Sequence, residues 1–374
     1  MIVERIIMRE LSLRLKTPFR ISSGTTFERR ILLLELTDES GTTAWSECVA
    51  GEHPNYSSET IDTAWLMIRE HAAPRVMGRD IVHPADVWSL LERDFRGHNM
   101  AKAAVEMGVW ELFARQQGVA LSRLIGGKRT SVETGISIGI QPSPGALIEE
   151  ITSRLADGYR KIKVKIMPGF DVEYLTMLRH ALGPEIPLMV DANSAYTPAD
   201  IDRLMVLDGL GLLMIEQPLG PDDLLQHAHL QKLLTTPICL DESITGPDRM
   251  RDMLELGSGR IVNIKPGRVG GFGPSIAIHD LCLEAGIPIW CGGMLESGVG
   301  RGYNLALASL PGFTLPGDLS PSARYWERDI VSPEWIMGSD GTITLPLDRP
   351  GTGVEVDTGL VESLTSRSEV LIPG

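Results

Sequence analysis

Polar residues recur about every 25 positions at the ends of short apolar runs in the middle of the chain. Lys165, Asp191, Glu216, Asp241 and Lys265 are separated by 26, 25, 25 and 24 residues. A strand, a helix and two short loops occupy about this length, so each residue is expected at the same height in successive βα units. Such a repeat closes most naturally into a barrel, whose active-site face lies at the carboxyl ends of the strands. The period therefore predicts five ionisable groups around one pocket.

The segments that carry this repeat have the composition of buried parallel strands. After residue 130, short runs rich in β-branched residues alternate with amphipathic helical stretches, which is typical of a parallel sheet built from βα units. Strands are expected within 132–140, 159–166, 186–193, 211–218, 236–243, 260–267 and 287–294.

The regions on either side of the repeat predict a second, smaller domain. Strand-like runs at 29–38 and 42–47 mix with helical stretches around 59–73 and 84–93. Residues 99–118 have the apolar spacing of a buried helix, with a polar N-cap candidate and a final glycine. The segment after residue 331 is rich in Gly and Pro and is expected to return to the first domain. The predicted division is an α+β domain at 1–125, a barrel of βα units at 126–325 and a C-terminal segment at 326–374.

Composition excludes several classes of protein. With 374 residues, 43% of them hydrophobic, the chain can bury a large core. A formal net charge of -14, without a dense block of Lys and Arg, argues against a nucleic-acid partner. The N-terminus alternates charged with apolar residues and no run approaches a membrane span, so a cytoplasmic protein with no membrane partner is expected. The four cysteines lack C-x-x-C pairing and are expected to be buried, reduced thiols.

Three carboxylates in the repeat predict a metal site. Asp191, Glu216 and Asp241 each end an apolar run, and no His or Cys accompanies them at ligand spacing. Hard oxygen ligands of this kind favour Mg²⁺, or Mn²⁺ in its place, over Zn²⁺. The alternative is that each carboxylate caps the helix that follows, as Thr197 and Asp200 are expected to do. Three carboxylates in register make the metal site the stronger interpretation.

Two lysine positions predict acid–base chemistry. Lys163 and Lys165 are two apart, so on a strand both point to one side, while Ile162 and Val164 point to the other. Two cations crowded near a bound metal favour the neutral amine of the inner one, so Lys165 can serve as a base near neutral pH. Lys265 falls four strands further around an eight-strand ring, nearly opposite. The pair can therefore act on either face of one carbon, although a solvated lysine face on a half-exposed strand would also give a K-x-K pattern.

This set of residues suits removal of a proton next to a carboxylate. Such a proton is weakly acidic, and its loss creates a dianionic enediolate that a metal ion and ammonium groups stabilise. Gly292 and Gly293 either let the backbone approach a ligand or form a plain tight turn. The RVGGFG stretch at 268–273 lacks the GK[ST] ending and the dinucleotide spacing, so it is weak evidence for a phosphate loop.

The motifs KVK, VDAN, IEQP, LDES and NIKPG resemble those of the enolase superfamily, in its muconate-lactonising-enzyme subgroup. Longer stretches, GYRKIKVKI, DANSAYT, TPICLDESI, IVNIKPGRVGG and PIWCGGMLESGVGR, are similar to the o-succinylbenzoate synthase and N-acylamino acid racemase family. The resemblance covers the barrel. It extends weakly into the first domain, where TPFRISSGTT and AGEHPNYSSET are similar to two loops that cap the substrate.

The resemblance implies a (β/α)7β TIM-like barrel with an α+β capping domain, and one site for two reactions. One is dehydration of 2-succinyl-6-hydroxy-2,4-cyclohexadiene-1-carboxylate to o-succinylbenzoate in menaquinone biosynthesis, and the other is racemisation of N-succinylamino or other N-acylamino acids. It implies Lys165 and Lys265 as the two bases, Lys163 as support for the small-molecule carboxylate substrate, and Mg²⁺ ligands at Asp191, Glu216 and Asp241. Further matches are pocket-lining Asn193, Ser137, Gly293 and Met294, with Arg268 and Glu242 in the surrounding layer. Arg268 matches an arginine of the racemising branch, so a dedicated racemase is the alternative. Family members are commonly dimers or octamers, so a homo-oligomer is expected.

Other classes fit only parts of the pattern. A Schiff-base aldolase would place a lysine on a barrel strand but would leave three carboxylates unexplained. Metal-dependent hydrolases use His-rich ligand sets, and none of the eight histidines falls at an expected strand end. A non-catalytic binding protein would tolerate loss of both lysines. Dipeptide epimerases and cycloisomerases of the same superfamily share the core residues, but the epimerases' acidic eighth-strand motif is replaced here by PGDLSPSARYW.

Overall fold

A parallel sheet of seven strands forms most of a barrel wall in the computed structural model, which describes residues 1–374. The strands follow one another around the wall in chain order. They are β5 (Gly135–Ile138), β6 (Lys161–Lys165), β7 (Leu188–Asp191), β8 (Ile215–Glu216), β9 (Ile238–Leu240), β10 (Ile261–Ile264) and β11 (Ile289–Cys291). Each strand lies inside one of the seven segments predicted from the sequence.

Residues 313–319 close the barrel between β11 and the first strand. Phe313 bridges Ile289, and Gly317 bridges Thr134, both in parallel orientation. The backbone N–H of Asp318 donates to the carbonyl of Cys291, 2.9 Å away. Since these residues pair with both edges of the sheet, they act as the eighth strand, and the predicted (β/α)7β barrel fold is confirmed.

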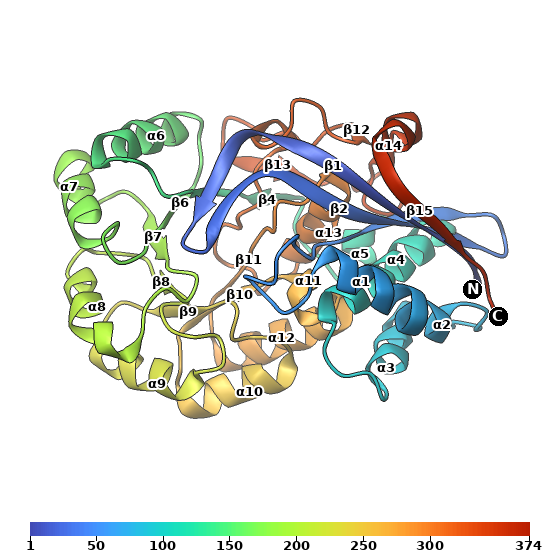
Figure 1. The fold of residues 1–374 in the computed structure, drawn as a ribbon, viewed down its shortest axis with the longest axis horizontal. Helices are drawn as coiled ribbons and strands as arrows, with labels where there is room; N and C mark the ends of the chain where they lie inside the picture. Colours follow the sequence, from blue (N-terminus) through green and yellow to red (C-terminus); the bar gives the residue numbers. More distant parts are fainter.

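Helices surround the barrel, and α6 to α10 follow one another around the outside of β6 to β10 (Figure 1). The sequence of α6 shows why a helix forms there. Ser143 caps its N-terminus by accepting from the Ala146 N–H, Pro144 occupies the first turn, and Leu147 and Ile151, four residues apart, are buried in the barrel's core. The helices are α6 (Pro144–Ala156), α7 (Val172–Leu182), α8 (Ile201–Asp208), α9 (Leu224–Leu233), α10 (Pro247–Leu256), α12 (Phe272–Ala285) and α13 (Gly298–Ala308), with short turns η3 (Pro198–Asp200) and α11 (Pro266–Val269).

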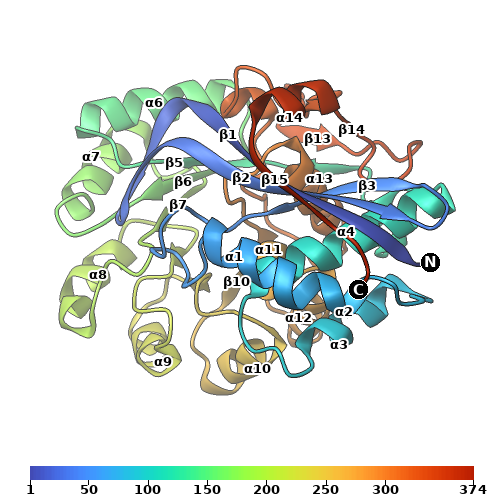
Figure 2. The same ribbon diagram turned by 45° about the vertical axis from the view of Figure 1, so that its right-hand side comes forward.

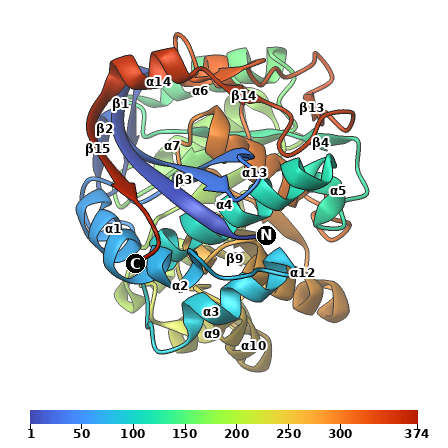
Figure 3. The ribbon, with the colours of Figure 1, turned by 90° about the vertical axis from the view of Figure 1, so that its right-hand side faces the viewer.

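An antiparallel sheet of order β15-β1-β2-β3 forms the cap. Its strands are β1 (Val3–Ile21), β2 (Gly24–Asp38), β3 (Thr43–Cys48) and β15 (Thr365–Leu371). The length of β1 was not predicted. Pairing of β15 with β1, in which Leu371 lies opposite Ile6, places the C-terminal strand along the N-terminal one, and Figure 3 shows this strand running beside the blue ribbons of the sheet. The β1–β2 hairpin extends across the open end of the barrel toward β6 and β7 (Figures 1 and 2), where Ile140 N–H donates to the Arg20 carbonyl at 2.9 Å.

The cap also contains seven helical segments, of which the longest packs against both β3 of the sheet and α11 of the barrel. They are α1 (Ile61–Met67), the π-helical turn η1 (Ile68–Ala72), α2 (Ala73–Val76), η2 (Pro84–Asp86), α3 (Val87–Glu92), α4 (Asn99–Gln117) and α5 (Leu121–Leu124). The helix predicted at 99–118 is α4, which is buried along nearly all its length and ends, as expected, at Gly118 in a left-handed conformation. Its first amides are bound by the Glu59 carboxylate, which accepts from Met100 and Ala101.

The C-terminal part of the chain links the two regions. Short strands pair as β4 (Ser131–Glu133) with β13 (Thr342–Thr344) and β12 (Val331–Ser332) with β14 (Glu355–Val356). The remaining helical segments are η4 (Ser322–Arg324) and α14 (Thr358–Leu364). Sixty-four buried apolar residues, mainly of the barrel, form one core, and 28 in the cap form a second. The four cysteines are buried and free, as predicted. None of the helices combines the length and the apolar character that a membrane span requires.

Candidate active site

The five periodic residues converge at the carboxyl ends of the barrel strands. Lys165 is in register with Asp191, and Asp191 with Glu216, so β6, β7 and β8 end at one height. Asp241 and Lys265 directly follow β9 and β10. All five side chains are buried, with at most 8% of any residue exposed. Ionisable groups held this far from water must neutralise one another or bind a ligand.

Asp191 is shared by two lysines. Its Oδ2 lies 2.6 Å from Lys165 Nζ and 3.2 Å from Lys163 Nζ, while Oδ1 accepts from the Asn193 N–H at 3.0 Å. Burial alone would raise the pKa of Asp191, but the two ammonium groups outweigh it, and the pKa is lowered. Lys165 Nζ also donates to Asn193 Oδ1 at 2.6 Å. The side chain of Lys165 is therefore oriented from two sides.

Glu216 lies at the centre of the group. Its Oε1 accepts from Asn263 Nδ2 at 2.7 Å, and its Oε2 lies 3.2 Å from Lys163 Nζ. Burial, together with the neighbouring charges of Asp191 and Asp241, raises the pKa of Glu216 to about 8. The carboxylates repel one another strongly enough here that a cation among them would be stabilising.

Asp241 joins the barrel to the cap. Its Oδ2 accepts from Lys265 Nζ at 2.7 Å, and its Oδ1 accepts from Tyr56 OH at 3.0 Å and from the Arg268 guanidinium. Tyr56 belongs to the cap, and its hydroxyl also accepts from Lys265 Nζ at 3.1 Å. Burial lowers the pKa of Lys265, but Asp241 more than offsets this and the pKa is raised. Tyr56 of the cap thus contacts Lys265, one of the two predicted bases.

The three carboxylates do not cap the helices that follow them. The N-cap residues of η3, α9 and α10 are Thr197, Asp223 and Gly246, so the capping alternative is excluded. No three His, Cys, Asp or Glu side chains stand together as a ready metal-ligand group, and a lysine instead contacts one oxygen of each of the three carboxylates. The donor set nevertheless fits a hard divalent cation, since it offers three buried carboxylates at the ends of consecutive strands.

Asn193 connects Lys165 to Glu242. Its amide Nδ2 donates to Glu242 Oε1 at 2.9 Å, while its Oδ1 accepts from Lys165. Glu242 Oε2 is buried without a hydrogen-bond partner. Burial, followed by the charge of Asp241, raises the pKa of Glu242 to about 7. The chain Glu242–Asn193–Lys165 therefore holds one predicted base through a contact additional to the one with Asp191.

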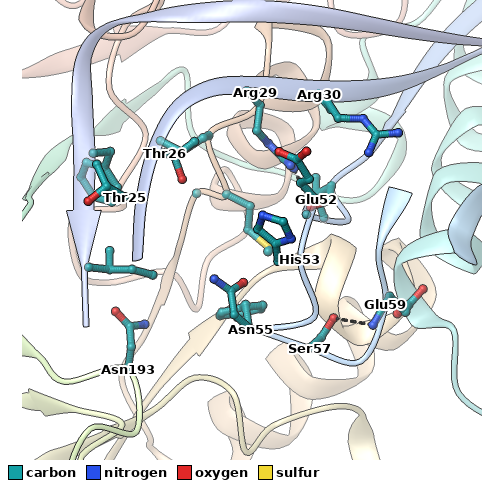
Figure 4. Close-up of a pocket in the computed structure, with 18 of the residues that line it drawn as sticks. Thr25, Thr26, Arg29, Arg30, Glu52, His53, Asn55, Ser57, Glu59 and Asn193 are labelled. Atoms are coloured by element: carbon teal, nitrogen blue, oxygen red, sulfur yellow. Dashed lines mark hydrogen bonds between the residues drawn. The ribbon is translucent and has the colours of Figure 1, made fainter. Parts of the chain in front are cut away.

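A cavity of about 370 Å³ opens onto both predicted bases. Lys165, Lys265, Asn193, Gly293 and Met294 line its barrel side. Its other wall comes from the cap, and Figure 4 shows Thr25 and Thr26 of the β1–β2 hairpin facing the loop that carries Glu52, His53, Asn55 and Ser57. Both stretches that resemble substrate-capping loops thus border this cavity.

Three predicted residues lie behind the cavity wall. Lys163, Glu242 and Arg268 are buried and contact the lining residues or the carboxylates. Ser137 does not line the cavity either. It is the register partner of Lys163 on β5, and its Oγ is buried without a hydrogen-bond partner.

The two glycine-rich stretches have structural explanations. A Cβ on Gly292 would lie 2.4 Å from Asn263 Oδ1 and 2.7 Å from Lys265 Cε, so this glycine leaves room for a predicted base. In the 268–273 stretch, the amides of Phe272 and Gly273 each donate to Glu106 of α4 at 2.8 Å. A carboxylate of the cap therefore occupies the amides that a phosphate would need, which removes the phosphate-loop interpretation.

Four charged or polar residues of the site were not predicted. Asn263 precedes Lys265 by two positions, and Lys161 precedes Lys163 by two, so strand alternation could have revealed both. Asp318 lies in the eighth strand, which has no preceding long apolar run. Tyr56 sits in a cap loop, where no spacing rule places it over the barrel.

The comparisons with known proteins agree with this geometry. Residues 3–126 match the mandelate racemase / muconate lactonizing enzyme N-terminal domain, and residues 146–360 match the enolase C-terminal domain-like family. The o-succinylbenzoate synthase of Geobacillus stearothermophilus is 50% identical over 98% of this chain and 97% of its own. The N-succinylamino acid racemase of Thermus thermophilus is 47% identical, covering 97% of both chains.

A solved structure agrees as well. An enolase superfamily member from Listeria innocua superposes with a TM-score of 0.95 at 36% identity, over 100% of this chain and 99% of that one. The resemblance in the sequence motifs is therefore confirmed over the full length of the chain, cap included. The chain belongs to the enolase superfamily, in the family of mandelate racemase and muconate lactonizing enzyme.

Proposed function

We propose that this enzyme removes the α-proton of a carboxylate substrate, using Lys165 and Lys265 as opposed bases. The reactions are o-succinylbenzoate synthesis and racemisation of N-succinylamino acids. One observation carries the proposal: both lysines line the same cavity from β6 and β10, on either side of three buried carboxylates. Relatives at 42 to 50% identity bear the names of these two activities. The reactions share their first step, so one site serves both.

The proposed cofactor is Mg²⁺, with Mn²⁺ as a substitute. Enzymes of this superfamily generally use a divalent metal, commonly Mg²⁺. Asp191, Glu216 and Asp241 would hold it, because they are the buried oxygen donors at the strand ends. When bound, the ion supplies Lewis-acid stabilisation of the negative charge that develops on the substrate carboxylate.

Proton transfer is assigned to the two lysines. In racemisation, one neutral lysine takes the α-proton and the ammonium of the other delivers a proton to the opposite face. In the dehydration, Lys165 takes the proton from the carbon that bears the carboxylate, and its ammonium then protonates the hydroxide leaving the neighbouring carbon. A C–H and a C–O bond break, a C=C bond forms, and water departs.

The surrounding residues receive positioning roles. Lys163 supports the substrate carboxylate with its positive charge, and Asn193 holds Lys165 at 2.6 Å. Gly293 and Met294 shape the barrel side of the cavity, and Glu242 anchors Asn193. Ser137 lies beside Lys163 on the neighbouring strand, with its hydroxyl free to form a hydrogen bond. The four free, buried thiols suit a reducing compartment, so we include the cytoplasm in the proposal.

A dedicated N-succinylamino acid racemase is the second candidate. Arg268 favours a dedicated racemase, because this arginine holds Asp241, and Asp241 in turn holds Lys265. Racemisation needs Lys265 as a second acid–base group, whereas the dehydration needs only Lys165. The experiment is a parallel measurement of kcat/KM for o-succinylbenzoate formation and N-succinylphenylalanine racemisation, with Mg²⁺ and with EDTA. Efficient metal-dependent dehydration would support a role in menaquinone biosynthesis. Fast racemisation alone would support the second candidate, and absence of both activities would refute the substrate assignment.

A further inference from the structure

Asp318 is a buried acid that neither the proposed metal set nor the proposed bases include. It lies on the eighth strand, and only 5% of the residue is exposed. Its Oδ2 is 2.5 Å from Lys163 Nζ, and its Oδ1 is 3.4 Å from Lys161 Nζ. Lys161 Nζ has no hydrogen-bond partner and sits 3.4 Å from the centre of the Trp290 ring. Asp318 therefore bridges two buried ammonium groups beneath the cavity.

Lys163 is shared among three carboxylates. Besides Asp318, it contacts Asp191 Oδ2 and Glu216 Oε2, each at 3.2 Å. The contact with Asp318 is the shortest of the three. Around the barrel, Asp318 comes from the strand two places before β6, and Glu216 from the strand two places after it. Lys163 thus lies between the proposed metal ligands on one side and Asp318 on the other.

A divalent cation and Lys163 would compete for the same oxygens. If Asp191 and Glu216 turned to a metal, Lys163 would lose two of its three partners, and an unpaired buried ammonium is strongly destabilising. Asp318 is the partner that remains, since it already faces Lys161 and Lys163 and lies outside the metal-ligand set.

We propose that Asp318 is a positioning residue, which retains the Lys163 ammonium while Asp191 and Glu216 bind the metal. The inference rests on the proposed metal site. Without the Asp318 carboxylate, Lys163 has only the two proposed metal ligands to pair with, so it opposes metal binding. The rival interpretation is that Asp318 merely neutralises Lys161 and stabilises the barrel.

The test is Mn²⁺ binding to the purified, metal-free protein, followed by electron paramagnetic resonance of the free ion. Loss of a group that orients metal ligands typically weakens metal affinity by about 10- to 100-fold, and we expect this range for Asp318→Asn. Asp318→Glu retains the charge and should recover most of the affinity. Asp171→Asn is the matched control, because Asp171 is a buried acid paired with Arg203 outside the site. Its affinity should equal that of the wild type.

A double variant separates the two interpretations. If Asp318 acts through Lys163, adding Lys161→Met to Asp318→Asn should leave Mn²⁺ binding weak, whereas recovery to wild-type affinity would show that Asp318 only balances Lys161. Unchanged affinity in Asp318→Asn would overturn the proposal, as would an affinity loss matched by Asp171→Asn. At a fixed Mn²⁺ concentration, KM for N-succinylphenylalanine should rise as the affinity for the metal falls. Thermal unfolding checks that each variant is folded. If the wild type binds no Mn²⁺, the proposed metal site itself fails, and this inference with it.

Discussion

Removing one lysine at a time should separate the two halves of racemisation. We consider Lys165→Ala and Lys265→Ala, with Lys232→Ala on the exposed face of α9 as the control. A positioned acid–base group contributes typically about 10²- to 10⁴-fold in rate, so either active-site variant should lose racemisation by that factor. The fold should survive, because each deletion leaves its carboxylate partnered: Asp191 keeps Lys163, and Asp241 keeps Arg268 and Tyr56. The loss of about 3–5 kcal/mol expected for a stranded buried charge is therefore avoided.

The assay is proton exchange in D₂O, followed by NMR with each enantiomer of N-succinylphenylalanine. A single remaining base can take the α-proton from its own face and return deuterium to that face. Each variant should consequently exchange one enantiomer without racemising it, and the two variants should exchange opposite enantiomers. Racemisation at the wild-type rate in either variant, or exchange of the same enantiomer by both, would refute the arrangement of two opposed bases.

Three further outcomes follow from the contacts of the site. EDTA should abolish activity and Mg²⁺ should restore it. Mg²⁺ should also raise the melting temperature of the metal-free wild type but not that of Asp241→Asn, since a ligand stabilises only a protein that binds that ligand. Gly292→Ala should destabilise by about 1–3 kcal/mol and lower kcat, as its Cβ would displace Lys265, whereas Gly145→Ala in α6, with ordinary space around it, should be neutral in calorimetry and rate assays. Burial raises the pKa of Glu106 from 4.5 to about 7, so folding favours the protonated form of this side chain. The free energy of unfolding should therefore be highest below pH 4.5 and fall as the pH rises toward 7. Glu106→Gln should make the fall in melting temperature over this window shallower, by an amount equivalent to about 3 kcal/mol, and an unchanged slope would contradict the assignment.

The barrel was predictable because its constraint is periodic. One strand, one helix and two loops repeat with nearly constant length, so the position of Lys165 implies those of Asp191 and Lys265 without knowledge of distant contacts. The same repeat places the carboxylates at one height, which the register of β6, β7 and β8 confirms. Side-chain alternation within β6 similarly separates the lysines from Ile162 and Val164.

The cap side of the site was not predictable in the same way. Tyr56 reaches Asp241 across 185 positions of sequence, and Glu106 binds Phe272 and Gly273 from a helix of another domain. Such contacts depend on how two domains dock, and no local propensity or spacing encodes that docking. Asp318 was missed for a related reason: the eighth strand pairs through isolated bridges, so its sequence lacks the apolar run that marked the other seven.

The charges of the site explain how so many ionisable groups can be buried together. Five cations face five anions at their formal charges: Lys161, Lys163, Lys165, Lys265 and Arg268 against Asp191, Glu216, Asp241, Glu242 and Asp318. Counted at these formal charges the group would be neutral, which would limit the desolvation cost of burying it, although the raised pKa of Glu216 favours its protonated form until a cation binds. A divalent cation alone would leave two uncompensated positive charges, and a substrate with two carboxylates would restore neutrality. N-Succinylamino acids and the cyclohexadiene substrate each carry two carboxylates. The charge balance of the barrel therefore favours them over dipeptides, whose free ammonium group would leave part of the metal's charge unbalanced.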